Sequence, residues 1–199
     1  MKKKVLFVAF VVICLAIITT SSLAFFTAEE TAHNVITTGN VDIAVVETTL
    51  NGDGDEIEFP KEGFDGVMPG TSVSKIVRLE NIGQNGAWVR IKVDLAAKAA
   101  DGTELPLEQG GADIMTLDYN TDEWTYSDGY YYYNKILPPG ETTTALFENV
   151  TFAKQIGNEY QSGELTVVIN AHAVQSDNNP IPEAGVEPAV TDAKGWPDE

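Results

Sequence analysis

Apolar and polar residues alternate with a period of two along three well-separated segments of the chain. In the first, Val41, Ile43 and Val45 enclose Asp42 and Ala44, and residues 89–95 and 165–173 repeat the pattern. Successive side chains of a strand point to opposite faces, so this period indicates half-buried strands of an antiparallel sheet. The three segments are therefore predicted to be strands with one face in the core.

Further strands are predicted at residues 72–80, 123–126, 130–136 and 142–152. Turn-forming residues separate them, at Pro69-Gly70, Asn81-Ile82-Gly83, Asp128-Gly129 and Pro138-Pro139-Gly140. Many short strands with such punctuation favour an all-β antiparallel sandwich or jelly roll. Residues 96–116 do not alternate, and their Ala-rich start, residues 96–100, predicts a short helical turn. We expect one domain over residues 35–176 and a flexible acidic tail at 177–199, where little can be buried.

The first 24 residues are typical of a secretory signal. Lys2, Lys3 and Lys4 precede an uncharged apolar run over residues 5–18. This run is shorter than the roughly 20 residues that span a bilayer as a helix, so we expect a removed signal rather than a permanent anchor. Small residues at Ser22 and Ala24 predict cleavage between Ala24 and Phe25. The mature protein is then exported to the cell surface or the extracellular matrix.

The charge and the cysteine content of the chain reduce the number of functions that are expected for it. The chain has 12 Lys and Arg against 30 Asp and Glu, a formal net charge of −18. Removal of the signal leaves 9 against 30, or −21, a field that repels nucleic acid. The single cysteine, Cys14, lies within the signal. A disulfide framework or a cysteine nucleophile is therefore not expected in the mature protein.

Three groups of motifs together resemble one family. The first is the signal followed by Ala24-Phe25-Phe26-Thr27 and by residues 34–43. The second runs from Met68-Pro69-Gly70 to residues 79–83 and 87–91, and the third covers residues 160–165 and 171–175. In this order they resemble the TasA and camelysin family of exported proteins of Gram-positive bacteria, which the signal peptidase SipW processes. The segment 124–147 departs from the pattern and is similar to a shorter, clostridial-type branch.

The resemblance implies a jelly-roll domain with a structural role in the biofilm matrix. In TasA, subunits polymerise when the N-terminal strand of one fills a groove in the next. It implies that residues 25–34, beginning with Phe25, Phe26 and Thr27, form a donated strand, with self-association into fibres and processing by a SipW-like peptidase. Main-chain hydrogen bonds and two buried rings would supply the affinity. The alternative is that these residues fold back on their own domain.

A candidate calcium site is the only cofactor site that the sequence indicates. Asn51, Asp53, Asp55 and Glu62 occupy positions one, three, five and twelve of a calcium loop. Glu56 replaces the usual Gly at position six and Pro60 lies inside the loop, so an acidic hairpin loop is the alternative.

Two other functions are kept as alternatives. A surface metalloprotease of camelysin type would need a zinc site, but the chain has only His33 and His172 and no His-Glu-x-x-His. We therefore expect no enzyme, and an ordinary surface histidine at 172. The second alternative function is a monomeric surface module that binds a glycan or calcium. A candidate aromatic face for it comprises Trp124, Tyr126, Tyr130, Tyr131, Tyr132 and Tyr133, and cross-strand packing is the structural alternative.

Overall fold

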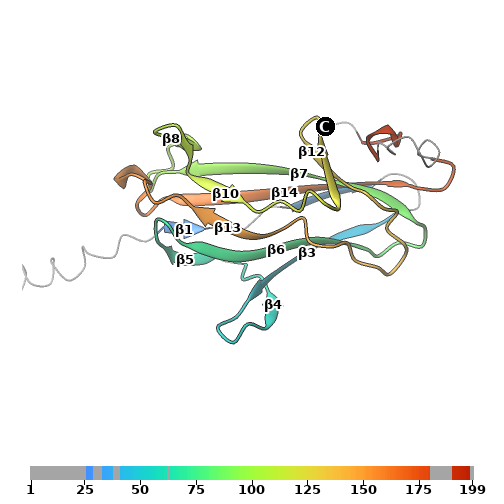
Figure 1. Ribbon diagram of the computed structural model, residues 1–199, viewed down its shortest axis with the longest axis horizontal. Helices are drawn as coiled ribbons and strands as arrows, with labels where there is room; N and C mark the ends of the chain where they lie inside the picture. Colours follow the sequence, from blue (N-terminus) through green and yellow to red (C-terminus); the bar gives the residue numbers. More distant parts are fainter. Residues whose placement is uncertain (1–25, 29–32, 38–40, 62, 180–189, 198–199) are drawn as a thin grey trace, which may run out of the picture.

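The computed structural model describes residues 26–28, 33–37, 41–61, 63–179 and 190–197, and nearly all of its regular structure is β-strand (Figure 1). The strands of the first half are β1 (Phe26–Ala28), β2 (His33–Thr37), β3 (Ile43–Leu50), β4 (Glu56–Glu58), β5 (Phe64–Val67), β6 (Ser72–Asn81) and β7 (Ala87–Lys98). The second half contains β8 (Glu108–Gln109), β9 (Ala112–Asp113), β10 (Met115–Leu117), β11 (Trp124–Ser127), β12 (Tyr130–Tyr133), β13 (Phe147–Phe152) and β14 (Glu164–Gln175). Two short 3-10 helices, η1 (Asn158–Tyr160) and η2 (Val190–Asp192), complete the described elements.

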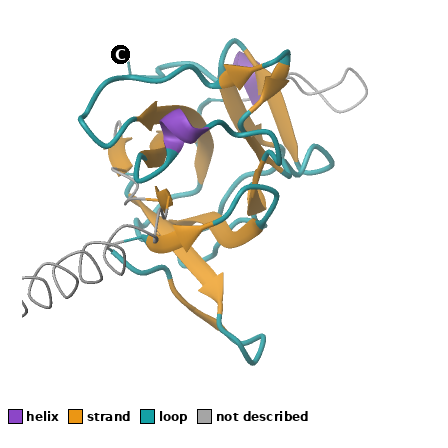
Figure 2. Cartoon of the chain, turned by 90° about the vertical axis from the view of Figure 1, so that its left-hand side faces the viewer, coloured by secondary structure: helices purple, strands orange, loops and turns teal. Residues whose placement is uncertain are grey.

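The strands form two packed sheets. The larger sheet has the order β11-β12-β7-β14-β1-β5, with β2 also paired to β14, and the smaller has the order β10-β13-β6-β3-β4. The end-on view of Figure 2 shows the sheets as layers on either side of the core, with the β3–β4 hairpin projecting away from them. Most ladders are antiparallel. The prediction of an all-β sandwich is confirmed.

The core lies between the sheets, where the period-two pattern placed it. Ile91 of β7 and Ile169 of β14 are fully buried in the larger sheet, and Val77 and Leu79 of β6 face them from the smaller sheet. Each such side chain contributes about 1.5–3 kcal/mol when removed from water. The alternating residues of these strands are thus the main source of stability.

The turns follow the predicted chemistry. Asp128 and Gly129 both adopt positive φ, 48° and 86°, between the paired residues Ser127 and Tyr130. A two-residue hairpin needs this conformation at both central positions, which Asp-Gly supplies at low cost. At the predicted turn after β6, the amide of Gly83 donates to Asn81 Oδ1 at 3.0 Å, and Asn81 is fully buried.

The helical turn predicted at residues 96–100 is wrong. Ala96, Ala97 and Lys98 continue β7 and pair with Thr166, Leu165 and Glu164 of β14. Alanine prefers helix, but a long neighbouring strand offers a complete set of backbone partners and buries Ala97 to 3% exposure. Tertiary pairing therefore outweighs the local preference here.

The two N-terminal strands pair in parallel with β14, a feature outside the antiparallel pattern expected from the sequence. Thr27 of β1 pairs with Glu164, and β2 pairs along residues 169–173. β1 and β2 thus lie along the same edge of β14 and run in its direction. The N-terminal segment predicted as a donated strand, residues 25–34, contributes β1 and the start of β2 to the larger sheet.

The C-terminal region differs from the expected flexible tail. Val190 and Ala193 are 3% and 4% exposed and pack against the larger sheet, so residues 190–197 are an ordered part of the fold. The predicted signal, residues 1–24, and its cleavage site between Ala24 and Phe25 lie outside the described residues, so both remain predictions. No helix within the described ranges is both long and apolar enough to cross a membrane.

Candidate functional site

The position of β1 in the larger sheet is the principal candidate site. β1 lies between two strands: Thr27 pairs with Glu164 of β14 on one side and with Asp65 of β5 on the other. The register with β5 is irregular between Phe26 and Thr27. A strand with neighbours on both sides offers its backbone N–H and C=O groups to both, which is the geometry of a strand added to a sheet.

Apolar side chains support this position from β5 and the segment before it. Val67 is 7% exposed, and Phe64 packs against the core. Phe64 also contacts Phe59 edge-to-face, with ring centroids 5.2 Å apart. At the start of β14, a Cβ on Gly163 would lie 2.3 Å from the carbonyl oxygen of Lys98. Only glycine lets β7 and β14 approach so closely beside β1.

A buried ion pair lies next to this apolar group. Lys75 of β6 is 3% exposed, and its Nζ lies 3.1 Å from Glu47 Oε1 of β3. The same Nζ lies 3.7 Å from the centroid of the Phe59 ring, a cation–π contact. Burial lowers the pKa of Lys75, while the Glu47 carboxylate opposes that shift. The segment carrying Phe59 and Phe64 thus closes the sandwich over a desolvated charge.

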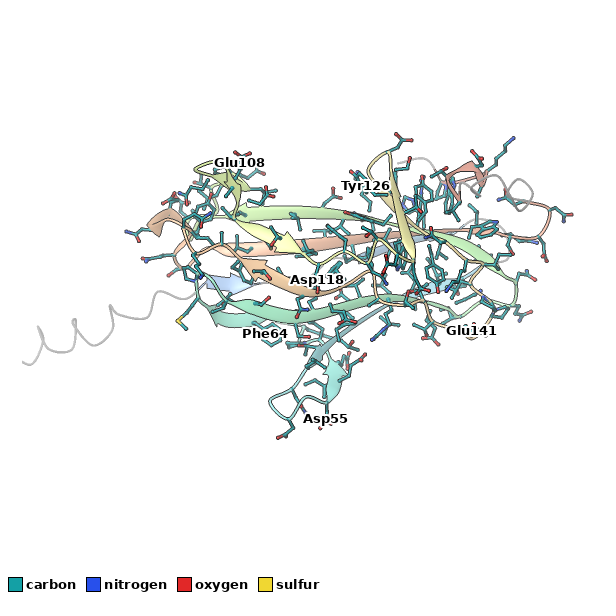
Figure 3. The ribbon with its side chains drawn as sticks, viewed as in Figure 1. Asp55, Phe64, Glu108, Asp118, Tyr126 and Glu141 are labelled. Carbon is teal, nitrogen blue, oxygen red and sulfur yellow. The ribbon has the colours of Figure 1, made fainter. Side chains whose placement is uncertain are left out.

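The candidate calcium ligands lie on the hairpin that projects from the smaller sheet, with Asp55 near its tip (Figure 3). Asn51 Oδ1 accepts hydrogen bonds from the amides of Asp53 and Asp55, at 2.9 and 2.8 Å. This oxygen therefore organises the turn. Glu62 lies outside the described residues. Among the residues that are described, no three His, Cys, Asp or Glu side chains cluster closely enough to hold a metal ion.

The candidate aromatic residues are divided between the two faces of the larger sheet. Trp124 and Tyr133 pack into the core, 1% and 7% exposed, with ring centroids 5.1 Å apart. Tyr130 and Tyr132 point to the outer face and are also buried, at 9% and 5%. Tyr126 alone is largely exposed, at 61%, and is labelled in Figure 3. Cross-strand packing thus accounts for most of the tyrosine run.

The exposed Tyr126 is the outer ring of a stack of three tyrosines. Tyr131 lies between Tyr126 and Tyr119, with centroid separations of 4.8 and 4.2 Å. Tyr119 in turn contacts the buried Phe147 edge-to-face. Burial raises the pKa of Tyr119 well above its ordinary value, and the neighbouring Tyr131 and Tyr126 hydroxyls add to the shift. Burial also raises the pKa of Tyr131.

We expect stability to fall as pH rises through 10. An unfolded tyrosine ionises near pH 10, whereas folded Tyr119 holds its proton to higher pH. The unfolded state then binds fewer protons than the folded state, so its free energy drops relative to the folded state. Urea unfolding at pH 8 and at about pH 10.5 measures the loss, which should be smaller in Tyr119→Phe. An unchanged loss in this variant would assign the effect to other groups.

The two histidines occupy different strands of the larger sheet. His33 begins β2, and His172 lies in β14. The register pairs Ile169, not His172, with His33. His172 is 4% exposed, so the expectation of an ordinary surface histidine is wrong. Its ring lies 5.6 Å from that of Tyr130, because other parts of the chain cover the outer face at this point.

The described architecture defines an all-β sandwich with a terminal strand set between two strands of its larger sheet. Comparisons with protein-family models, with curated proteins and with solved structures found no match to this chain.

Sequence reasoning missed two features of this geometry, although each has a sequence signal. Lys75 shares the parity of Val73, Val77 and Leu79 in a predicted strand, which places a lysine on the buried face. Trp196 lies in a segment that otherwise reads as tail. A large aromatic residue in a polar segment is a reason to expect that it packs against the domain.

Proposed function

We propose that this chain is an exported β-sandwich protein with a structural role at the cell surface or in the extracellular matrix, and that its N-terminal strand links copies into fibres. One observation carries the proposal: β1, which starts two residues after the expected cleavage site, pairs with both β14 and β5. Such a strand can be supplied by the same chain or by a neighbour, because the backbone partners are identical in both cases.

Physical chemistry supports an exchange at this position. β1 is only three residues long and lies at the expected free end of the mature chain, so its release disturbs little else. The expected mature chain begins with Phe25 and Phe26. Burial of these two side chains in a neighbouring subunit would contribute about 1.5–3 kcal/mol each. The acidic surface keeps free subunits apart at low ionic strength, and screening by salt then speeds growth.

A proline at Thr27 tests the role of the backbone. Mature protein beginning at Phe25 is expected to form fibres, and Thr27→Pro is expected to slow their growth at least tenfold, because proline removes the N–H that a strand with two neighbours needs. Thr27→Ala keeps this N–H and serves as the matched control. Sedimentation and electron microscopy across protein concentration and salt measure the assembly.

A peptide of residues 25–37 added to the Thr27→Pro protein should raise its melting temperature, since it restores the missing strand in trans. A second control is the Leu50→Ser, Ile57→Ser variant, which removes two exposed apolar side chains from the projecting hairpin. It should assemble normally. Mature protein that stays monomeric under all conditions, or equal assembly by Thr27→Pro and Thr27→Ala, would refute the proposal.

A further inference from the structure

The outer face of the larger sheet carries a buried group of aromatic and basic side chains. We call it the outer-face cluster and define it as Trp88, Arg90, Tyr130, Tyr132, His172 and Val174, contributed by β7, β12 and β14. Each of these side chains is 9% exposed or less. The cluster lies on the side of the sheet opposite the core, where strands of this kind usually meet solvent. Something other than the second sheet therefore covers it.

Arg90 is the centre of the cluster. Its guanidinium carbon lies 3.7 Å from the centroid of the Tyr130 ring and 4.7 Å from that of Trp196, so the planar cation is held between two aromatic faces. Nε donates to His172 Nδ1 at 3.2 Å, and Nη1 donates to the Tyr132 hydroxyl oxygen at 3.2 Å. Among the described residues no carboxylate forms an ion pair with Arg90. Aromatic rings and neutral acceptors hold this guanidinium in place.

The C-terminal segment, residues 190–197, covers the cluster. Figure 1 shows its backbone, at the red end of the colour scale, beside one end of the larger sheet. Val190 and Ala193 are buried against it, and Trp196 packs edge-to-face on Tyr132 with centroids 5.7 Å apart. Arg90 Nη2 donates to the carbonyl oxygen of Pro197 at 3.4 Å. The Trp-Pro pair thus fills the position above the guanidinium.

Asn179 fastens the segment at its other side. Asn179 Nδ2 donates to the carbonyl oxygen of Lys194 at 2.8 Å, and Asn179 Oδ1 accepts from the Lys194 amide at 2.9 Å. Trp88 Nε1 donates to the carbonyl oxygen of Asn179 at 3.0 Å. The segment belongs to neither sheet. It is held as a bound peptide is held, by an aromatic anchor and a few directed hydrogen bonds.

From these contacts we propose that the outer-face cluster is a binding site for a tryptophan-proline peptide, occupied in the isolated chain by its own residues 190–197 and open to the same segment of a second copy. The chain carries both the site and its ligand, so copies can exchange segments without any new surface. The proposal does not depend on the N-terminal strand.

Length and charge favour a second copy as the partner in trans. Ten residues, 180–189, separate Asn179 from Val190, and ten extended residues span up to about 33–36 Å, enough to reach an adjacent molecule. Residues 190–197 carry one acidic and one basic side chain, Asp192 and Lys194, so the segment is formally neutral. A neutral segment can approach a second, strongly acidic copy without adding to the electrostatic repulsion between the two molecules.

Binding of a labelled peptide with the sequence of residues 190–199 tests the site in the full-length mature protein. Trp196→Ala, whose own segment has lost its anchor, is expected to bind the peptide at least tenfold more tightly than wild type does. In wild type the tethered segment competes at an effective concentration on the order of millimolar. Trp196→Phe keeps a ring and should give an intermediate affinity. A peptide in which alanine replaces the tryptophan should not bind either protein.

The second half of the test measures binding of a second copy of the whole protein in place of the peptide. Immobilised Trp196→Ala protein should retain Arg90→Lys protein, whose flat guanidinium is lost and whose segment is therefore more readily released. It should retain at least tenfold less of the Arg90→Lys, Trp196→Ala double variant. Both ligands have the same N-terminal strand, so their difference reports only the C-terminal segment. Equal peptide binding by wild type and Trp196→Ala would overturn the site, and equal retention of the two copies would overturn the exchange.

Discussion

Replacing Glu47 by alanine is expected to lower the free energy of unfolding by about 3–5 kcal/mol, because it leaves the charge of Lys75 buried without its partner. The side chains of Lys75 and Glu47 are 4% and 12% exposed, and Phe59 covers the ammonium group. Water cannot reach the lysine to replace the lost carboxylate. The folded protein must then bear an uncompensated charge or release the proton.

The exposed pair between Arg78 and Glu56 is the matched control. It joins β6 and β4 across the intervening strand β3, and its side chains are 23% and 40% exposed. Glu56→Ala should cost at most about 1 kcal/mol. Urea unfolding of both variants at neutral pH gives the comparison. Equal losses would show that solvent reaches the Lys75–Glu47 pair.

The pH dependence of the same variant has a defined sign. The pKa of folded Lys75 is lowered by burial, and loss of Glu47 lowers it further, whereas an unfolded lysine keeps its proton to about pH 10.4. Between these two values the unfolded state binds more protons, so stability rises with pH. Glu47→Ala should therefore recover part of its loss as pH rises toward 10, and a Lys75→Met, Glu47→Leu double variant should show no such recovery.

Replacing Trp124 by alanine is expected to cost about 3–5 kcal/mol, the range for deleting a large buried aromatic side chain. Trp124 is 1% exposed and packs on Tyr133 in the core. Its indole N–H has no hydrogen-bond acceptor within the described part of the chain. Trp124→Phe removes this unpaired donor while keeping a ring, so it should cost clearly less than alanine.

Tyr126 is the control for this prediction, since it lies two residues away on the same strand and the same side of the sheet. It is 61% exposed and is the outer ring of the tyrosine stack, so Tyr126→Ala should change stability by about 1 kcal/mol or less. Thermal and urea unfolding of both variants measure the difference. Similar losses at the two positions would contradict the assignment of Trp124 to the core and Tyr126 to the surface.

Much of the fold was predictable because it depends on local rules. β7 and β14 show the alternation along residues 89–95 and 165–173, and this pattern fixed which side chains enter the core. The Asp128-Gly129 pair determined a two-residue hairpin, since few other residues adopt positive φ at both central positions. The same period of two places Tyr130 and Tyr132 on one face of the sheet and Tyr131 and Tyr133 on the other.

The remaining features depend on segments that are distant in the sequence. Residues 96–98 became strand because β14 offered partners to their backbone, and β1 and β2 run parallel to β14 because the chain enters the sheet along that edge. At the candidate site, the sequence predicted that the residues of β1 form a strand, but it did not predict that β14 and β5 are the neighbours of this strand.

The class of fold, the buried face of each long strand and the main turns follow from the amino-acid sequence alone, because they depend on the period of a strand and the conformational range of single residues. Which outward-facing residues are covered depends instead on how distant segments pack in three dimensions. Arg90, Tyr132 and His172 occupy positions that alternation assigns to solvent, yet residues 190–197 return from the far end of the chain to bury them. Such burial depends on contacts between remote segments, which no local pattern records.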